Sequence, residues 1–209
     1  MKKGISMGRR SDHTPEQLKE MILEEAWNVI EKEGIDKLTA RRIATAIGYT
    51  PGTIYSFFTS MEMLQLHLNA KTLNLLHETL SDPECNNPDN KPIKNMKLMA
   101  KNYISFAQKY RPHWLMLFEN RLEHLKKDEG WYQEKIDRLF EPLEAQMSAF
   151  YSDNQKRKRK VATRVLWASV HGICFLKETG RLSLVDEEKS TEHLSTFLIE
   201  NFIRGLKSK

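Results

Sequence analysis

Cysteine is scarce in this chain, and its two cysteines do not build a disulfide framework. Cys85 and Cys174 lie far apart and lack metal-ligand spacing, which argues against a disulfide-stapled scaffold and against a structural zinc site. No hydrophobic run approaches the roughly 20 residues that a membrane-spanning helix needs. The charged start, Met1-Lys-Lys, is not followed by the apolar stretch of a signal peptide. We therefore expect a cytoplasmic protein that does not engage a membrane.

The sequence also lacks the residue patterns of a catalyst. It has no glycine-rich phosphate loop, no pairing of a nucleophile with a base, and no paired catalytic carboxylates. His171 and Cys174 are three residues apart, a spacing that could bind a metal, but no third ligand is evident nearby, so a structural histidine is favoured. We expect neither an enzyme nor a bound cofactor or metal.

The segment from 38 to 58 carries the clearest functional signal. Thr39 is placed to cap a short helix, and Gly48 is placed to end it in a left-handed conformation. Thr50 then caps a second short helix with Pro51 at its first position, where a missing N–H costs nothing. The first helix has an apolar stripe at helical spacing: Ala40, Ile43, Ala44 and Ile47. Two compact helices joined by a tight turn suit insertion into the major groove of DNA.

Helical patterns fill the rest of the chain, without sustained strand alternation or an internal repeat. We predict an all-α protein of about nine helices, near residues 15–33, 40–47, 51–58, 60–80, 93–110, 114–118, 131–151, 154–178 and 186–206. The only strong loop signal is the Pro- and Asn-rich stretch 81–92. We place a helix-turn-helix DNA-binding domain at 14–76, and a helical ligand-binding and dimerisation domain at 77–209.

The net charge of +5 is compatible with a polyanionic partner. Residues 1–13 contain four basic side chains against Asp12 alone, which makes a basic arm before the first helix. A denser basic run at 156–160 has two interpretations, a solvated helix start or a nucleic-acid contact.

Residues 14–76 resemble the N-terminal domain of the TetR family of transcriptional regulators. The matching positions are Gly34, Leu38, Thr39, Ile43, Ala44, Gly48, Tyr49, Thr50, Gly52, Thr53, Ile54, Tyr55, Phe58 and Leu64. The segment from Trp167 to His171 and Gly172 resembles the tryptophan-histidine-glycine motif of one C-terminal domain type in that family. One departure is Met61, because the family usually has a phosphate-binding lysine where the fourth helix begins.

The resemblance implies binding to double-stranded DNA at a pseudo-palindromic operator. The expected DNA-binding residues are Arg9, Arg10, Thr39, Arg42, Thr50, Pro51, Gly52, Thr53, Tyr55 and Ser56. Thr39 can donate to a phosphate from a helix N-terminus while it caps the helix, and the resemblance implies that the Tyr55 hydroxyl reaches a phosphate. Threonines at the second helix can touch base edges without dictating one sequence. Arg41 and Arg42 are each either a DNA contact or a solvated side chain.

The C-terminal half is rich in methionine and aromatic residues, which form either a plain core or an apolar effector pocket. The resemblance favours a pocket for an apolar small molecule, with these lining residues: Met99, Tyr103, Phe106, Trp114, Phe118, Trp131, Phe140, Trp167 and His171. It also implies a homodimer through the helices at 154–179 and 186–206. We therefore expect a ligand-responsive regulator, in this family more often a repressor than an activator. The alternative is a constitutive DNA-binding or interaction protein without a pocket.

Overall fold

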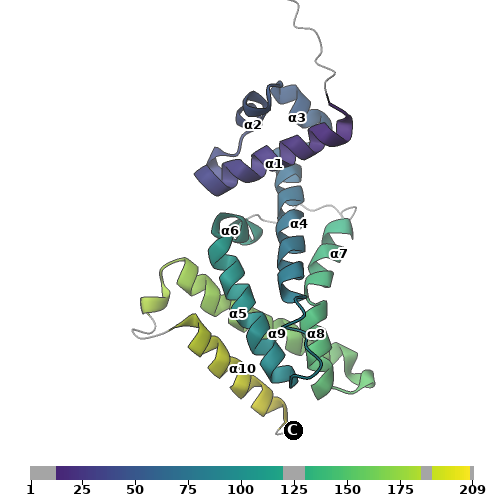
Figure 1. The fold of residues 1–209 in the computed structure, drawn as a ribbon, viewed down its shortest axis with the longest axis vertical. Helices are drawn as coiled ribbons and strands as arrows, with labels where there is room; N and C mark the ends of the chain where they lie inside the picture. The colour runs from purple at the N-terminus through teal and green to yellow at the C-terminus, as the bar shows by residue number, and fades with distance from the viewer. Residues whose placement is uncertain (1–12, 120–129, 185–189, 208–209) are drawn as a thin grey trace, which may run out of the picture. The chain divides into compact units, whose positions relative to one another are not determined.

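The computed structural model describes residues 13–119, 130–184 and 190–207, and within these ranges the chain is all-α (Figure 1). These ranges contain ten α-helices, joined in places by short 3-10 turns. The predicted fold class is thus confirmed, with one helix more than expected. The chain divides into two compact units, one ending at Leu68 and the other beginning at Asn69. This division and the predicted boundary at 76/77 both fall within helix α4 (Met61–Leu80).

The first unit is built from α1 (Pro15–Glu33), α2 (Ala40–Ile47), α3 (Pro51–Phe57) and the first turns of α4. A capping box fixes the start of α1: the Gln17 N–H donates to Thr14 Oγ1 at 3.2 Å, and the Thr14 N–H donates to Gln17 Oε1 at 2.9 Å. The helices bury one apolar core, made mainly by Ile22, Ala26, Ile30, Ile43, Ile54, Phe58 and Leu64. This core orients the short helices α2 and α3.

The second unit contains the rest of α4 and six further helices. These are α5 (Pro92–Lys109), α6 (Arg111–Glu119), α7 (Gly130–Leu139), α8 (Glu141–Met147), α9 (Lys156–Glu178) and α10 (Thr191–Lys207). Helix α5 packs against α8, α9 and α10, and α9 packs against α10 (Figure 1). The core between them consists mainly of Met96, Met99, Tyr103, Trp114, Leu166, Cys174 and Ile199.

The extra helix arises because the segment predicted as one helix at 131–151 is two helices. It breaks at Phe140, and Pro142 stands in the first turn of α8. Proline has no N–H to donate, and its ring would collide with the carbonyl of residue 138 in a continuous helix. A 3-10 turn at Ser148–Phe150 then ends the segment. The last helix begins at Thr191, and most of its predicted first turn, 186–189, lies outside the described residues.

Candidate nucleic-acid interface and interior cavity

A tight turn joins α2 to α3. Gly48 has φ 78° and ψ 27°, a left-handed conformation that favours glycine over residues with a Cβ atom. The Tyr49 N–H donates to the Ala44 carbonyl at 2.8 Å, which satisfies one of the last carbonyls of α2. This is the geometry predicted for the turn, and it ends α2 at Ile47 so that α3 can start four residues later.

The start of α3 presents an exposed polar surface. Thr50 occupies the N-cap position and Pro51 the first position, as expected, but the Thr50 hydroxyl does not cap the helix. Its Oγ1 instead lies 3.3 Å from Thr53 Oγ1, because the two side chains stand on the same side of the first turn. Pro51 and Gly52 are exposed beside them. The surface therefore combines two hydroxyls, the ring of Pro51 and, at Gly52, a stretch of backbone without a side chain.

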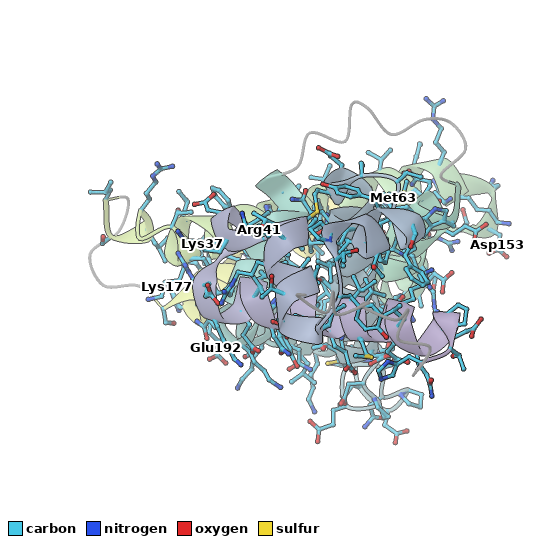
Figure 2. The ribbon with its side chains drawn as sticks, turned by 90° about the horizontal axis from the view of Figure 1, so that it is seen from above. Lys37, Arg41, Met63, Asp153, Lys177 and Glu192 are labelled. Atoms are coloured by element: carbon cyan, nitrogen blue, oxygen red, sulfur yellow. The ribbon has the colours of Figure 1, made fainter. Side chains whose placement is uncertain are left out.

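Two predicted contact residues on α2 have partners in the protein. Thr39 Oγ1 accepts a hydrogen bond from the Arg42 N–H at 3.2 Å, so Thr39 caps α2 as expected. The Arg42 guanidinium forms an ion pair with Glu33 at the end of α1. A phosphate would have to compete with Glu33 for this guanidinium. Arg41 and Lys37 are exposed on the same part of the chain (Figure 2).

The later residues of α3 differ in how available their hydroxyls are. Tyr55 is 50% exposed, and its hydroxyl makes no hydrogen bond to another described residue. The Ser56 hydroxyl donates to the Thr53 carbonyl at 2.7 Å, so Ser56 is already committed to its own helix. Of the two, Tyr55 is the side chain free to donate to an external acceptor.

The start of α4 is less suited to a phosphate than the family pattern suggests. Ser60 Oγ accepts from the Met63 N–H at 3.2 Å, while Met61 supplies no charge. A hydrogen bond with Ser60 lowers the pKa of the Glu62 carboxyl, so Glu62 is ionised at neutral pH. This exposed negative charge stands next to the position where the family usually has a lysine. The family pattern predicted only the missing lysine at Met61, and it did not predict the negative charge of Glu62.

His13, the first described residue, contacts the turn between α2 and α3. His13 Nδ1 and the Tyr49 hydroxyl are 2.9 Å apart, and their ring centroids are separated by 6.2 Å. This contact holds His13 against Tyr49, two residues before α3. Arg9 and Arg10 precede His13 by a few residues and lie outside the described part of the chain.

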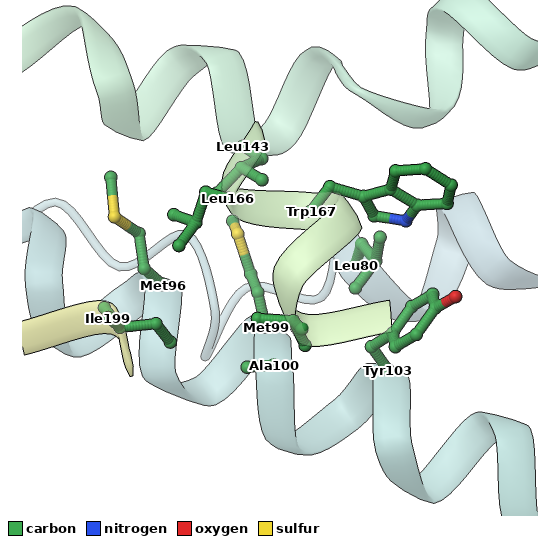
Figure 3. Close-up of a pocket in the computed structure, with 10 residues that line it drawn as sticks. Leu80, Met96, Met99, Ala100, Tyr103, Leu143, Leu166, Trp167 and Ile199 are labelled. Carbon is green, nitrogen blue, oxygen red and sulfur yellow. The ribbon is translucent and has the colours of Figure 1, made fainter. Parts of the chain in front are cut away.

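The second unit contains a small, partly open apolar cavity of about 40 Å³ (Figure 3). Its lining comes from α4, α5, α8, α9 and α10: Leu80, Met96, Met99, Ala100, Tyr103, Leu143, Leu166, Trp167, Val170 and Ile199. None of these residues is charged. The only polar side-chain groups among them are the Tyr103 hydroxyl and the Trp167 indole N–H.

Aromatic rings gather beside the cavity around His171. The His171 ring is stacked on Trp167, with centroids 5.2 Å apart and planes at 18°, and it lies 4.3 Å from the Phe118 ring and 5.2 Å from the Trp114 ring. Burial lowers the pKa of His171, so the imidazole is neutral at neutral pH. His171 therefore acts as a packing and hydrogen-bonding group. Within the described residues, no three His, Cys, Asp or Glu side chains come together to hold a metal ion.

Two family models match the chain. "Bacterial regulatory proteins, tetR family" covers residues 22–68. "Tetracyclin repressor-like, C-terminal domain" covers residues 96–202, and this second match alone spans more than half of the chain. The chain belongs to the TetR family. It is a DNA-binding transcriptional regulator and not an enzyme. Neither description mentions the tryptophan-histidine-glycine type, so that finer assignment stays a prediction. No helix in the described ranges has both the length and the apolar character needed to span a membrane.

Solved structures share this fold at low sequence identity. A protein of unknown function from Rhodococcus sp. RHA1 has a TM-score of 0.71 and 20% identity, over 94% of this chain and 98% of that chain. The TetR-family regulator PfmR from Thermus thermophilus has a TM-score of 0.58 and 16% identity, over 88% and 97%. The multidrug binding protein EbrR, solved with imidazole, has a TM-score of 0.60 and 17% identity, over 88% and 93%. Among curated proteins, none matches this sequence significantly.

The structure brings together most of the residues predicted to line an effector pocket in this TetR-family chain. Three line the cavity: Met99, Tyr103 and Trp167. Four more pack in the aromatic cluster around Trp167: Trp114, Phe118, Phe140 and His171. Two make other ring contacts: Phe106 lies 4.8 Å from Tyr110, and Trp131 lies 5.8 Å from Tyr132.

Several lining residues were missed by the sequence reasoning. They are mostly aliphatic: Leu80, Met96, Ala100, Leu143, Leu166, Val170 and Ile199. Helical spacing could have indicated Met96, three residues before the predicted Met99, and Val170, three residues after the predicted Trp167. Leu80, Leu143 and Ile199 come from three other helices, and no local signal relates them to the cavity.

Proposed function

We propose that this TetR-family protein is a homodimeric repressor that a small apolar effector releases from a pseudo-palindromic operator. The observation that carries the proposal is the exposed first turn of α3, which a glycine turn holds beside α2. Two such helices, one from each subunit, would enter successive major grooves about 34–36 Å apart. The protein would act in the cytoplasm, where bacterial DNA lies.

The contacts with DNA divide by type. Thr50, Pro51, Gly52 and Thr53 would lie against base edges, where hydroxyls and a bare backbone permit close approach. Thr39 and Tyr55 would donate to phosphates, and Arg9, Arg10 and Arg42 would add charge-assisted contacts. Ser56 would contribute through its exposed surface, because its hydroxyl is bonded to Thr53.

Exposed apolar faces on the last two helices support the dimer. On α9, Val161, Val165, Ala168 and Gly172 recur at helical spacing, and Val165 is 49% exposed. On α10, Phe197 is 62% exposed. Large apolar side chains left open on two adjacent long helices favour burial against a second copy. The interface would be a four-helix bundle with two helices from each chain.

The cavity supports control by a ligand. Its lining includes Leu80 at the end of α4, and α4 runs without interruption back to Met61 in the first unit. A ligand that displaced Leu80 would shift this helix, and it would have to prefer the DNA-incompetent conformation to change the equilibrium. The fold is shared with a protein described as multidrug binding, which favours an effector of broad apolar character. The segment from Trp167 to Gly172 would form the tryptophan-histidine-glycine motif.

The small size of the cavity favours a second candidate, a constitutive DNA-binding protein. About 40 Å³ holds roughly one water molecule, whereas pockets for drug-sized ligands measure about 300–1,000 Å³. An effector would therefore have to open the site by displacing flexible side chains such as Met96 and Met99. If no apolar compound weakens DNA binding, the constitutive function is the correct one.

Selection from a random duplex library tests the DNA-binding function directly. We expect recovery of a two-fold symmetric motif, with half-sites whose centres lie about 10 base pairs, or a multiple of that distance, apart. Folded protein, verified by circular dichroism, that enriches no motif would contradict the proposal.

Tyr55→Phe is expected to weaken operator binding by roughly 1.5–3 kcal/mol, which is about 10- to 150-fold, because it removes one hydroxyl donated to a charged phosphate. Thermal stability should hardly change, since the hydroxyl has no partner among the described residues. Fluorescence anisotropy with a labelled operator measures the loss. Tyr151→Phe, which removes a hydroxyl from a half-buried tyrosine of the second unit, is the matched control. Equal affinity of Tyr55→Phe and wild type would show that the phosphate role is wrong.

A further inference from the structure

The Trp167 indole N–H is a buried donor without an acceptor. Its Nε1 atom is inaccessible to solvent and makes no hydrogen bond to another described residue. A buried donor left without an acceptor has lost its hydrogen bonds to water without replacing them, so a molecule that brings an acceptor to it recovers part of that free energy on binding. Trp167 also lines the apolar cavity, so its indole is one of the side chains that a ligand entering this space would contact.

The other polar group of the cavity is already engaged. The Tyr103 hydroxyl lies 2.8 Å from His171 Nδ1, and it accepts from Trp114 Nε1 at 3.2 Å. Burial raises the pKa of Tyr103 and lowers that of His171, so both groups are neutral, and the contact between the phenol oxygen and Nδ1 is a hydrogen bond between neutral partners. Figure 3 shows the phenol oxygen and the Trp167 nitrogen on the same side of the site.

The indole of Trp167 is near enough to the Tyr103 hydroxyl to oppose part of the rise in the phenol pKa, but it does not reach hydrogen-bond geometry. The Trp114 Nε1–H group donates to that oxygen instead. The donor still available to a ligand in the cavity is therefore the Trp167 N–H.

The electrostatics of the cavity disfavour a charged ligand. Its lining contains no ionisable group other than the neutral Tyr103. Arg164, three residues before Trp167 on α9, forms ion pairs with Glu144 at 2.7 Å and Asp137 at 3.9 Å, and its guanidinium lies 3.5 Å from the Phe140 ring centroid. This cation is therefore neutralised by two carboxylates. A ligand carboxylate would be desolvated without a counter-ion, which is strongly unfavourable.

We propose that the effector is a neutral, largely apolar molecule that presents one hydrogen-bond acceptor, such as a ketone, ester or lactone oxygen, to Trp167 Nε1. This inference rests on the proposed function of the second unit as an effector domain. Met96 and Met99 provide the room, because a thioether chain can change rotamer with little loss of packing. The apolar part of the effector replaces these side chains against Leu166 and Val170, and its oxygen satisfies the indole.

Three small probes that share one ring system test the proposal: indane, 1-indanone and indane-1-carboxylate. The readout is the indole ¹H–¹⁵N resonance of Trp167 in the full-length protein, assigned by triple-resonance NMR and titrated with each probe. We expect 1-indanone to move this resonance downfield and to bind up to about tenfold more tightly than indane, the gain of one hydrogen bond. The carboxylate should bind more weakly than either.

Trp167→Phe should abolish the advantage of 1-indanone over indane, because a phenyl ring packs in the cavity but donates nothing. Trp131→Phe, which changes a tryptophan outside the cavity lining, should preserve it. The wild-type comparison needs no variant, so the test stands even if Trp167→Phe does not fold. Equal binding of indane and 1-indanone, tighter binding of the carboxylate, or no binding of any probe at millimolar concentration would each overturn the proposal.

Release of operator DNA by the same probes separates this inference from the proposed function. If indane-1-carboxylate binds best and releases DNA, the repressor function stands and the proposed ligand chemistry is wrong. If 1-indanone binds as expected but leaves operator affinity unchanged, the cavity chemistry stands and the regulatory role fails.

Discussion

Phe197→Glu is expected to convert the protein to a monomer and to abolish operator binding at the same time. Phe197 is 62% exposed on α10, so the subunit's own core does not depend on it. In the proposed dimer this side chain is buried, and a carboxylate there would be desolvated without a partner. A monomer can contact only one half-site, so it loses the avidity of the two-site complex. We expect its operator affinity to fall roughly 100-fold or more.

Sedimentation velocity and gel shift with the selected operator check the two parts of this prediction. Leu184→Glu is the matched control, because it makes the same kind of change at an apolar residue that is 84% exposed outside α9 and α10. Val165→Glu, on the exposed face of α9, should reproduce the effect of Phe197→Glu. A monomeric wild type at micromolar concentration would refute the dimer, and a monomeric variant with full operator affinity would refute the link to DNA binding.

Gly52→Glu is expected to eliminate operator binding while the fold is retained. Gly52 is the second residue of α3 and is exposed, and a Cβ atom added there meets only Thr50 Oγ1, at an ordinary contact distance of 3.8 Å. Replacing glycine near a helix start with an acidic residue should raise folding stability by about 0.5–1 kcal/mol, since it favours helix and complements the dipole. The same carboxylate would face DNA, where like-charge contacts cost several kcal/mol, a loss of roughly 100-fold or more.

Gly52→Ala provides the control, because it adds the methyl group without the charge and should lower affinity far less. Thermal melts and anisotropy titrations of both variants measure stability and DNA binding separately. If Gly52→Glu keeps its operator affinity, the start of α3 does not approach DNA, and the proposed recognition surface is wrong.

Local signals in the sequence located the first three helices closely. Thr14 with Pro15 marks the start of α1, and Gly34 its end, as observed. Gly48 ends α2 through its left-handed conformation, and Pro51 opens α3. These positions could be predicted because caps and turns involve residues within a few positions of each other. Pro92 opens α5 in the same way, although the prediction left it in the preceding loop and began the helix at 93. The break before α8 was missed, because Pro142 lies within a segment with a continuous helical pattern.

The residues of the DNA-binding surface were predicted from the sequence, but their contacts with other side chains of the protein were not. The sequence placed Arg42 among residues near DNA, but only the packing of α1 against α2 brings Glu33 to its guanidinium. In the same way, Thr50 was expected to cap α3 with its hydroxyl, and the backbone of the first turn instead directs it to Thr53. Such pairings depend on side-chain orientation, which residue type and spacing do not specify.

By itself, the sequence determined the all-α class, the family and the helix-turn-helix, because each rests on local spacing, on capping residues and on a motif of fixed length. Only the tertiary structure decided which side chains surround the cavity, that the Trp167 N–H is left without an acceptor, and that Phe197 is exposed. The physical reason is that a cavity and an exposed face arise where five helices, distant in sequence, pack together. Their rotations are set by the whole core and not by any one segment.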